Sequence, residues 1–191
     1  MTGRTTFLRW LPTFLAFPLG GLLAVTLVGS VTDPFRAGLA GAVAGAVLGA
    51  AQWLALRPTG LGPAWAGVTA LGVAAGSVLA AALTGAATSP PALILTGAVT
   101  GTVLGAGQAL LVRGGWLVGA AWTGLVGLAW ALGWLVTANV ILDADRGYVV
   151  FGSSGALLAT LLTGLLLRRL VVLPVAAHRP VTPPAGEGVR A

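Results

Sequence analysis

The chain contains neither cysteine nor lysine, and it has little charge of either sign. Without cysteine it can form neither disulfides nor thiolate metal sites. Its 191 residues include four acidic side chains and one histidine, so we expect no metal, no cofactor and no enzyme activity. Charged residues make up 7% of the chain, whereas a soluble domain carries about 25%. This composition excludes a water-soluble globular protein.

Apolar residues dominate what is present: 57% of the chain is hydrophobic and the mean hydropathy is +0.99. About 20 apolar residues are needed for a helix to cross a bilayer. The sequence predicts an all-α integral membrane protein whose residues 1–172 form six transmembrane helices. The runs that meet the length are 8–30, 37–56, 63–86, 92–112, 116–138 and 150–172. Residues 173–191, rich in proline and glycine, are predicted to be a disordered cytoplasmic tail.

The arginines predict how these helices are oriented. If the N-terminus faces the cytoplasm, eight of the ten arginines fall on that side and only Arg36 and Arg146 fall outside. This positive-inside bias, with an even number of spans, predicts that both termini are cytoplasmic. Arg57, Arg113 and Arg168 are predicted to anchor helix ends, with binding of lipid headgroups as the alternative.

The net charge, the use of arginine without lysine, and the tryptophans predict the partners of the protein and the membrane in which it lies. The net charge of +6 comes with no basic patch interleaved with aromatics, so nucleic acid is not an expected partner. Abundant alanine, glycine and arginine without lysine indicate a GC-rich bacterial genome, and we expect the bacterial inner membrane. Five tryptophans near the proposed inner helix ends are predicted to form an interfacial belt, namely Trp10, Trp53, Trp65, Trp116 and Trp122.

An internal repeat is the most informative pattern. The stretch from Gly41 to Arg57 returns almost letter for letter from Gly97 to Arg113, 56 residues later. A further shift by 55 residues gives a looser third copy that ends at Arg168. We therefore predict three helical hairpins of about 56 residues, all inserted in the same direction. The small residues of the repeat are predicted to let helices pack closely, and they are Gly41, Gly45, Gly49, Gly97, Gly101, Gly105, Gly152 and Ala156.

The repeat also places three polar side chains at corresponding positions, Gln52, Gln108 and Thr163. One hypothesis is a polar ring near the inner face that coordinates a solute or lines a pore. The favoured hypothesis is hydrogen bonding between helices, which contributes about 0.6 kcal/mol per bond in membranes.

Three other groups of residues resemble functional sites, and a structural role fits each of them better. Gly152-Ser153-Ser154-Gly155 is similar to the serine motif of rhomboid proteases, but the single histidine, His178, falls on the opposite side of the membrane. Asp143 and Asp145 fit a solvated turn better than a cation site, because no further oxygen ligands lie nearby. Trp130 and Trp134, four residues apart on one helix face, are expected to pack against neighbouring helices.

The element Gln52-Trp53-Leu-Ala-Leu-Arg57, with Trp65 and the helix after it, resembles uncharacterised bacterial multipass membrane proteins that repeat Gln-Trp-Leu-x-Leu-Arg. The similarity spans about residues 38–138, and Ala109 departs from it in the second copy. The resemblance implies a multipass fold and no activity or functional residue.

Every distinctive residue thus serves packing or orientation. The sequence predicts a non-enzymatic structural or assembly component of the membrane, in contact with the lipid bilayer and with either a second copy or another membrane protein. The alternative is a channel or passive transporter for a small solute, with the polar ring of Gln52, Gln108 and Thr163 on its path.

Overall fold

The computed structural model describes residues 2–112, 114–140 and 152–170, and every secondary-structure element in them is helical. The all-α prediction is therefore confirmed. The elements are α1 (Gly3–Trp10), η1 (Leu11–Leu15), α2 (Ala16–Val28), α3 (Pro34–Leu56), η2 (Arg57–Thr59), α4 (Ala64–Thr84), α5 (Pro90–Ala109), α6 (Gly115–Val140) and α7 (Ser153–Leu170).

Five helices in this part of the chain are long and apolar enough to cross a membrane, as expected of a multipass membrane protein. They are Gly3–Val28, Pro34–Thr59, Ala64–Thr84, Pro90–Ala109 and Gly115–Asn139. The sixth predicted run is observed as α7, which is not among the five because Arg168 and Arg169 lower its hydropathy. The tail at 173–191, with His178, and the cluster of Asp143, Asp145 and Arg146 lie outside the described residues.

The first helix begins earlier than predicted, at Gly3 rather than near residue 8. The side chain of Thr2 caps it by accepting a 3.3 Å hydrogen bond from the backbone N–H of Thr5. The span is not a regular α-helix throughout, because Pro12 lies in the tighter turn η1 between α1 and α2. Proline lacks the N–H that an α-helical interior requires, and the turn accommodates it.

At the start of α3, Asp33 and Pro34 provide the standard signals for a helix N-terminus. Asp33 accepts a 2.9 Å hydrogen bond from the backbone N–H of Arg36, and this bond lowers the pKa of its carboxyl group. The helix α4 ends at Gly85, where the connection to α5 begins. Gly85 has φ of 62°, a left-handed cap conformation that glycine adopts readily. These signals fix where α3 begins and where α4 ends.

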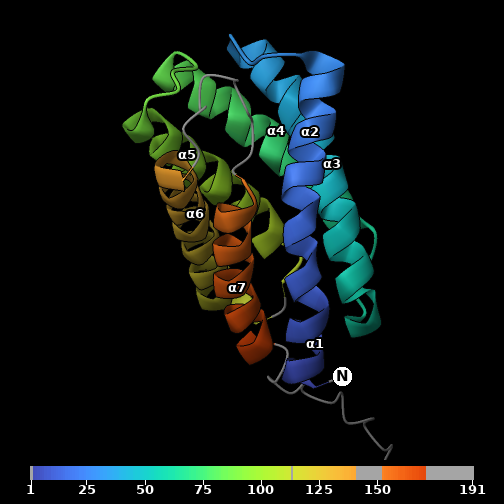
Figure 1. Ribbon diagram of the computed structural model, residues 1–191. Helices are drawn as coiled ribbons and strands as arrows, with labels where there is room; N and C mark the ends of the chain where they lie inside the picture. Colours follow the sequence, from blue (N-terminus) through green and yellow to red (C-terminus); the bar gives the residue numbers. More distant parts are fainter. Residues whose placement is uncertain (1, 113, 141–151, 171–191) are drawn as a thin grey trace, which may run out of the picture.

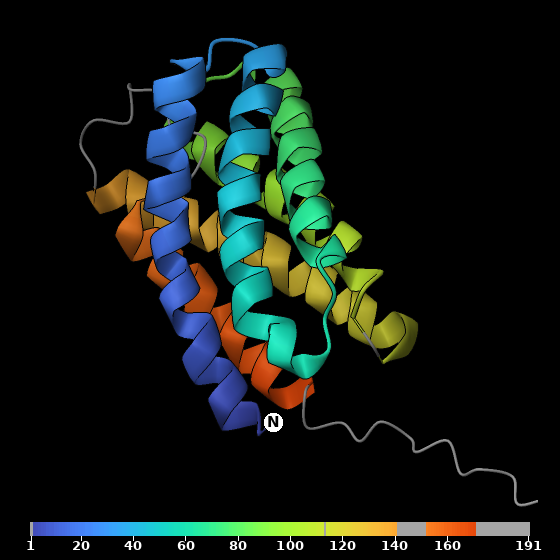
Figure 2. The ribbon, with the colours of Figure 1, turned by 90° about the vertical axis from the view of Figure 1, so that its right-hand side faces the viewer.

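Each helix packs beside the next one along the chain, and α7 returns to pack against α1 (Figure 1). In the view of Figure 1 the long rod of α1 and α2 lies between α3 and α7, and the rotated view shows α7 crossing behind this rod (Figure 2). The first and last described helices thus close the bundle on itself. This closure brings Trp10 of the first helix against residues of the last one.

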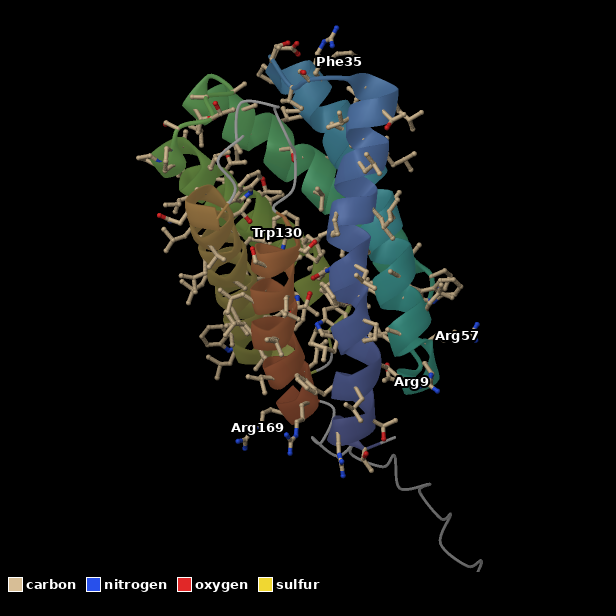
Figure 3. The ribbon with its side chains drawn as sticks, in the orientation of Figure 1. Arg9, Phe35, Arg57, Trp130 and Arg169 are labelled. Atoms are coloured by element: carbon tan, nitrogen blue, oxygen red, sulfur yellow. The ribbon has the colours of Figure 1, made fainter. Side chains whose placement is uncertain are left out.

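The two ends of the bundle differ in charge. Arg9, Arg57 and Arg169 lie together at one end, and Phe35 lies at the other (Figure 3). Arg36, near Phe35, forms a 3.7 Å ion pair with Asp33, the sole carboxylate side chain among the described residues. Below, these are called the arginine end and the Asp33 end.

Candidate functional site

The candidate site is a buried cluster of Gln52, Trp65, Thr69, Gln108 and Trp122 near the arginine end. Gln52 lies in the last turns of α3, five residues or about 7 Å before Arg57. The short connection to α4 brings Trp65 back beside it. The indole N–H of Trp65 donates a 3.1 Å hydrogen bond to Oε1 of Gln52, and both side chains are buried.

Gln108 of α5 joins this pair to a second tryptophan. Its amide nitrogen donates to Oε1 of Gln52 at 3.2 Å and to the hydroxyl of Thr69 at 2.9 Å. Its Oε1 accepts from the indole N–H of Trp122 at 3.2 Å. The indole rings of Trp65 and Trp122 meet edge to face with centroids 6.1 Å apart. Side chains from α3, α4, α5 and α6 therefore form one continuous hydrogen-bonded cluster.

Thr163, the third predicted polar position, lies in α7 and has a different partner. Its hydroxyl accepts a 3.1 Å hydrogen bond from the indole N–H of Trp10 and donates to the carbonyl of Ala159 at 2.8 Å. Trp10 also donates to the carbonyl of Thr160 at 3.1 Å. The structure thus brings Gln52 and Gln108 into direct contact and pairs Thr163 with Trp10.

The predicted interfacial belt of tryptophans is wrong for three of its five members. Trp10, Trp65 and Trp122 are at most 2% exposed, and each donates its indole N–H to a side chain in the interior. Trp116 is 79% exposed and fits the belt prediction. The polar edge of a buried indole needs a partner, and the side chains of Gln52, Gln108 and Thr163 supply one.

The glycines of α3 lie against α4. A Cβ atom added at Gly49 would lie 2.6 Å from the carbonyl oxygen of Ala66, and one at Gly45 would lie 2.9 Å from Cα of Ala70. Gly41 faces Val73 and the hydroxyl of Ser77 in the same way. Even alanine would collide with backbone at these positions, so the glycines allow the closest approach of the two helices.

The glycines of α5 lie against α6. A Cβ atom at Gly97 would lie 2.5 Å from the carbonyl oxygen of Trp130, one at Gly101 would lie 2.7 Å from Cβ of the same residue, and Gly105 faces Thr123. Trp130 and Trp134 are each 3% exposed, and Phe17 of α2 packs against Trp130 with ring centroids 5.5 Å apart. These two tryptophans therefore lie in the packed interior.

In α7 the small residues that make the closest contacts differ from those predicted. Gly155 packs against the carbonyl of Gly133 in α6, and Gly164 packs against Trp10 and Phe7 of α1. Of the predicted pair, Ala156 is fully buried, whereas Gly152 is half-buried and donates its N–H to Thr137 at 3.1 Å. The predicted third copy matches the glycine pattern only loosely, and for that reason its spacing did not single out Gly155 or Gly164.

The predicted anchors are Arg57, Arg113 and Arg168. Arg57 and Arg168 are exposed, and Arg4, Arg9 and Arg169 are exposed as well. Arg113 lies outside the described residues. Figure 3 shows Arg9, Arg57 and Arg169 toward the same end of the bundle, within α1, η2 and α7 respectively.

Several polar residues of the interior were not singled out from the sequence, among them Thr69, Ser77 and Thr100. Thr69 is fully buried and accepts from Gln108, and its spacing of four from Trp65 is the signal that could have found it. Ser77 and Thr100 are buried with hydroxyls that make no hydrogen bond to the described residues. Single hydroxyls within small-residue helices give no sequence signal that separates packing from binding.

The chemistry open to the cluster is limited to neutral hydrogen bonding. Its members are amides, indoles and one hydroxyl, none of which changes protonation state near neutral pH. Among the described residues no group of three or more histidine, cysteine or carboxylate side chains could hold a metal ion. Comparison of the chain with protein-family models, with curated proteins and with solved structures found no match.

Proposed function

We propose that the chain is a non-enzymatic, six-span structural or assembly component of a bacterial inner membrane, with both termini cytoplasmic. The observation that carries the proposal is the pairing of Gln52 with Gln108. Oε1 of Gln52 accepts from both Gln108 and Trp65, and the polar atoms of Gln108 are all bonded within the cluster. Amides engaged in this way tie helices together, whereas a selectivity ring needs its polar groups to face a solute.

The proposal includes a threefold pseudo-repeat, supported by the way the helices cross within each predicted hairpin. Gly20 lies on Ala44, Gly76 lies on Thr100, and Gly133 lies on Gly155. The three glycines are 56 and 57 residues apart, and each meets the second helix of its own hairpin. Related contacts at a fixed interval are expected when one hairpin has been copied and stacked.

The pairs between hairpins support the same architecture. Gln52 bonds to Trp65, Gln108 bonds to Trp122, and Thr163 bonds to Trp10. In each case the second helix of one hairpin meets the first helix of the next. The pairing of α7 with α1 continues that order around the bundle, so that the last hairpin meets the first. This cyclic order is what parallel repeats about an axis along the membrane normal would produce.

The proposed orientation can be measured by labelling single cysteines, because the natural chain has none. Thr5 is exposed near the arginine end, and Ser89 is exposed between α4 and α5 at the Asp33 end. In intact cells we expect Ser89→Cys to react with a membrane-impermeant thiol reagent and Thr5→Cys to react only after permeabilisation. Labelling of Thr5→Cys in intact cells would refute the cytoplasmic N-terminus.

The proposal that the chain is not a channel or transporter can be tested by measuring solute flux into liposomes. Purified protein in liposomes is expected to give no flux of water, glycerol, urea or ammonia above that of empty liposomes. The double variant Gln52→Leu/Gln108→Leu should likewise give no flux above that of empty liposomes, and it should be less stable than the wild type. A flux that the wild type supports and the double variant abolishes would instead favour the channel hypothesis.

A further inference from the structure

The first and last described helices meet at the arginine end, and both carry exposed arginines there. Arg4 is exposed near the start of α1, and Arg168 and Arg169 are exposed in the last turn of α7. Figures 1 and 2 both show the start of α1 beside the end of α7. Three guanidinium groups from two helices that are distant in the sequence therefore gather in one region of the surface.

Contacts between the two helices place Arg4 and Arg168 at nearly the same level. A Cβ atom added at Gly164 of α7 would lie 3.1 Å from Cδ2 of Phe7 in α1. From this contact toward the arginine end, Arg4 lies three residues or about 4.5 Å along α1, and Arg168 lies four residues or about 6 Å along α7. The contact is made through a glycine, so the two helices are close. Because the arginine side chain is long, guanidinium groups from both helices can reach one phosphate group.

Exposed leucines lie one helical turn inside these arginines. Leu8 follows Arg4 by four residues and is 56% exposed, and Leu165 precedes Arg169 by four residues and is 50% exposed. Residues four apart share a helix face, so each leucine lies on the same face as an arginine. The surface thus combines positive charge at the end of the bundle with apolar side chains toward its middle. An amphiphilic anion matches both parts, whereas a soluble anion or an acidic protein would use only the arginines.

We propose that this surface of α1 and α7 binds an anionic phospholipid, with its phosphate at the three arginines and its acyl chains along the two leucines. Guanidinium groups present paired N–H donors that match the oxygens of a phosphate. The zwitterionic lipid phosphatidylethanolamine carries an ammonium group that offsets its phosphate, so a lipid with net negative charge fits better. The proposal goes beyond the structural function proposed above, and it holds whichever end of the bundle faces the cytoplasm.

The test measures which lipid contacts this surface. Because the natural chain lacks cysteine, a Leu165→Cys variant of the full chain can carry the small fluorophore bimane beside the site. The protein is placed in bilayers of equal phosphatidylglycerol and phosphatidylethanolamine, with bromine on the acyl chains of one lipid at a time. Bromine quenches the fluorophore only on close approach, so the two samples give the relative binding constant of the two lipids at this position. Leu27→Cys, at the Asp33 end of α2 and 65% exposed in the wild type, is the control position.

We expect phosphatidylglycerol to be preferred about fivefold or more at Leu165→Cys, since each arginine near an anionic lipid contributes about that factor. At Leu27→Cys the two lipids should quench equally. Adding Arg168→Gln/Arg169→Gln should reduce the preference at Leu165→Cys to about one. The control pair Arg36→Gln/Arg57→Gln removes the same charge from exposed positions outside the site and should leave the preference in place.

Three results would overturn the proposal. Equal quenching by both lipids at Leu165→Cys would leave the arginines to another anionic partner. An equal preference for phosphatidylglycerol at Leu27→Cys would mean that the net charge of the whole protein attracts the lipid. A preference that survives Arg168→Gln/Arg169→Gln would show that these arginines do not hold the phosphate.

Discussion

Replacing Gly97 by alanine is expected to lower the free energy of unfolding by about 3 kcal/mol, the upper part of the range for overpacking a filled interior. The added Cβ atom would lie 2.5 Å from the carbonyl oxygen of Trp130 and 2.6 Å from Cδ1 of Trp134. The carbonyl belongs to the backbone of α6 and cannot rotate away as a flexible side chain can. The helices α5 and α6 must therefore separate, and their remaining contacts weaken. Unfolding of purified protein in mixed micelles measures the loss.

Matched controls separate this contact from the general effect of removing a glycine. A Cβ atom added at Gly124 in α6 would have no atom of the described residues within 4 Å, and the same holds for Gly67 in α4. Alanine at either position should leave stability unchanged or raise it by up to about 1 kcal/mol, because alanine is the better helix former. Gly49→Ala should behave like Gly97→Ala, since its Cβ atom would meet the carbonyl of Ala66. Equal effects at Gly97 and Gly124 would refute the packing argument.

The sequence predicted the helices well because their signals are local. Long apolar runs act within a few residues, and they placed the runs 37–56 and 92–112 correctly. The predicted starts were a few residues late, because α3 begins at Pro34 after its cap Asp33 and α5 begins at Pro90. The regular spacing of Gly41, Gly45 and Gly49 likewise marked one face of α3, and the structure places that face on α4. The start of the first helix was less predictable, since threonine capping extends it into polar residues.

The partners of buried polar groups could not be predicted, because they depend on which helices meet. Trp65 and Trp122 lie near helix ends in the sequence, as interfacial tryptophans do. Only the fold shows that their indole N–H groups donate to Gln52 and Gln108. The repeat placed Gln52, Gln108 and Thr163 in one set, yet the structure bonds two of them together and the third to Trp10.

Replacing Gln108 by leucine is expected to cost about 2–4 kcal/mol of folding free energy. Two hydrogen bonds donated by Gln108 are lost, at about 0.6 kcal/mol each within a membrane. The larger part comes from Trp122, whose indole N–H is left buried without its acceptor, at about 1–3 kcal/mol. Gln52→Leu should cost less, because the amide of Gln108 keeps its bond to Thr69 and only Trp65 loses its acceptor.

A double-mutant cycle tests whether the cost arises from the unpaired indole rather than from a change of side-chain shape. Trp122→Phe in the wild type removes the N–H and leaves Oε1 of Gln108 without its donor, whereas in Gln108→Leu it removes the group that has lost its acceptor. The second substitution should therefore cost less in the variant than in the wild type, with a coupling of about 1 kcal/mol. The loss of aromatic volume is common to both arms and cancels. Coupling near zero would mean that the Gln108–Trp122 bond contributes nothing, and the cluster could not then be what ties α5 to α6 at the arginine end.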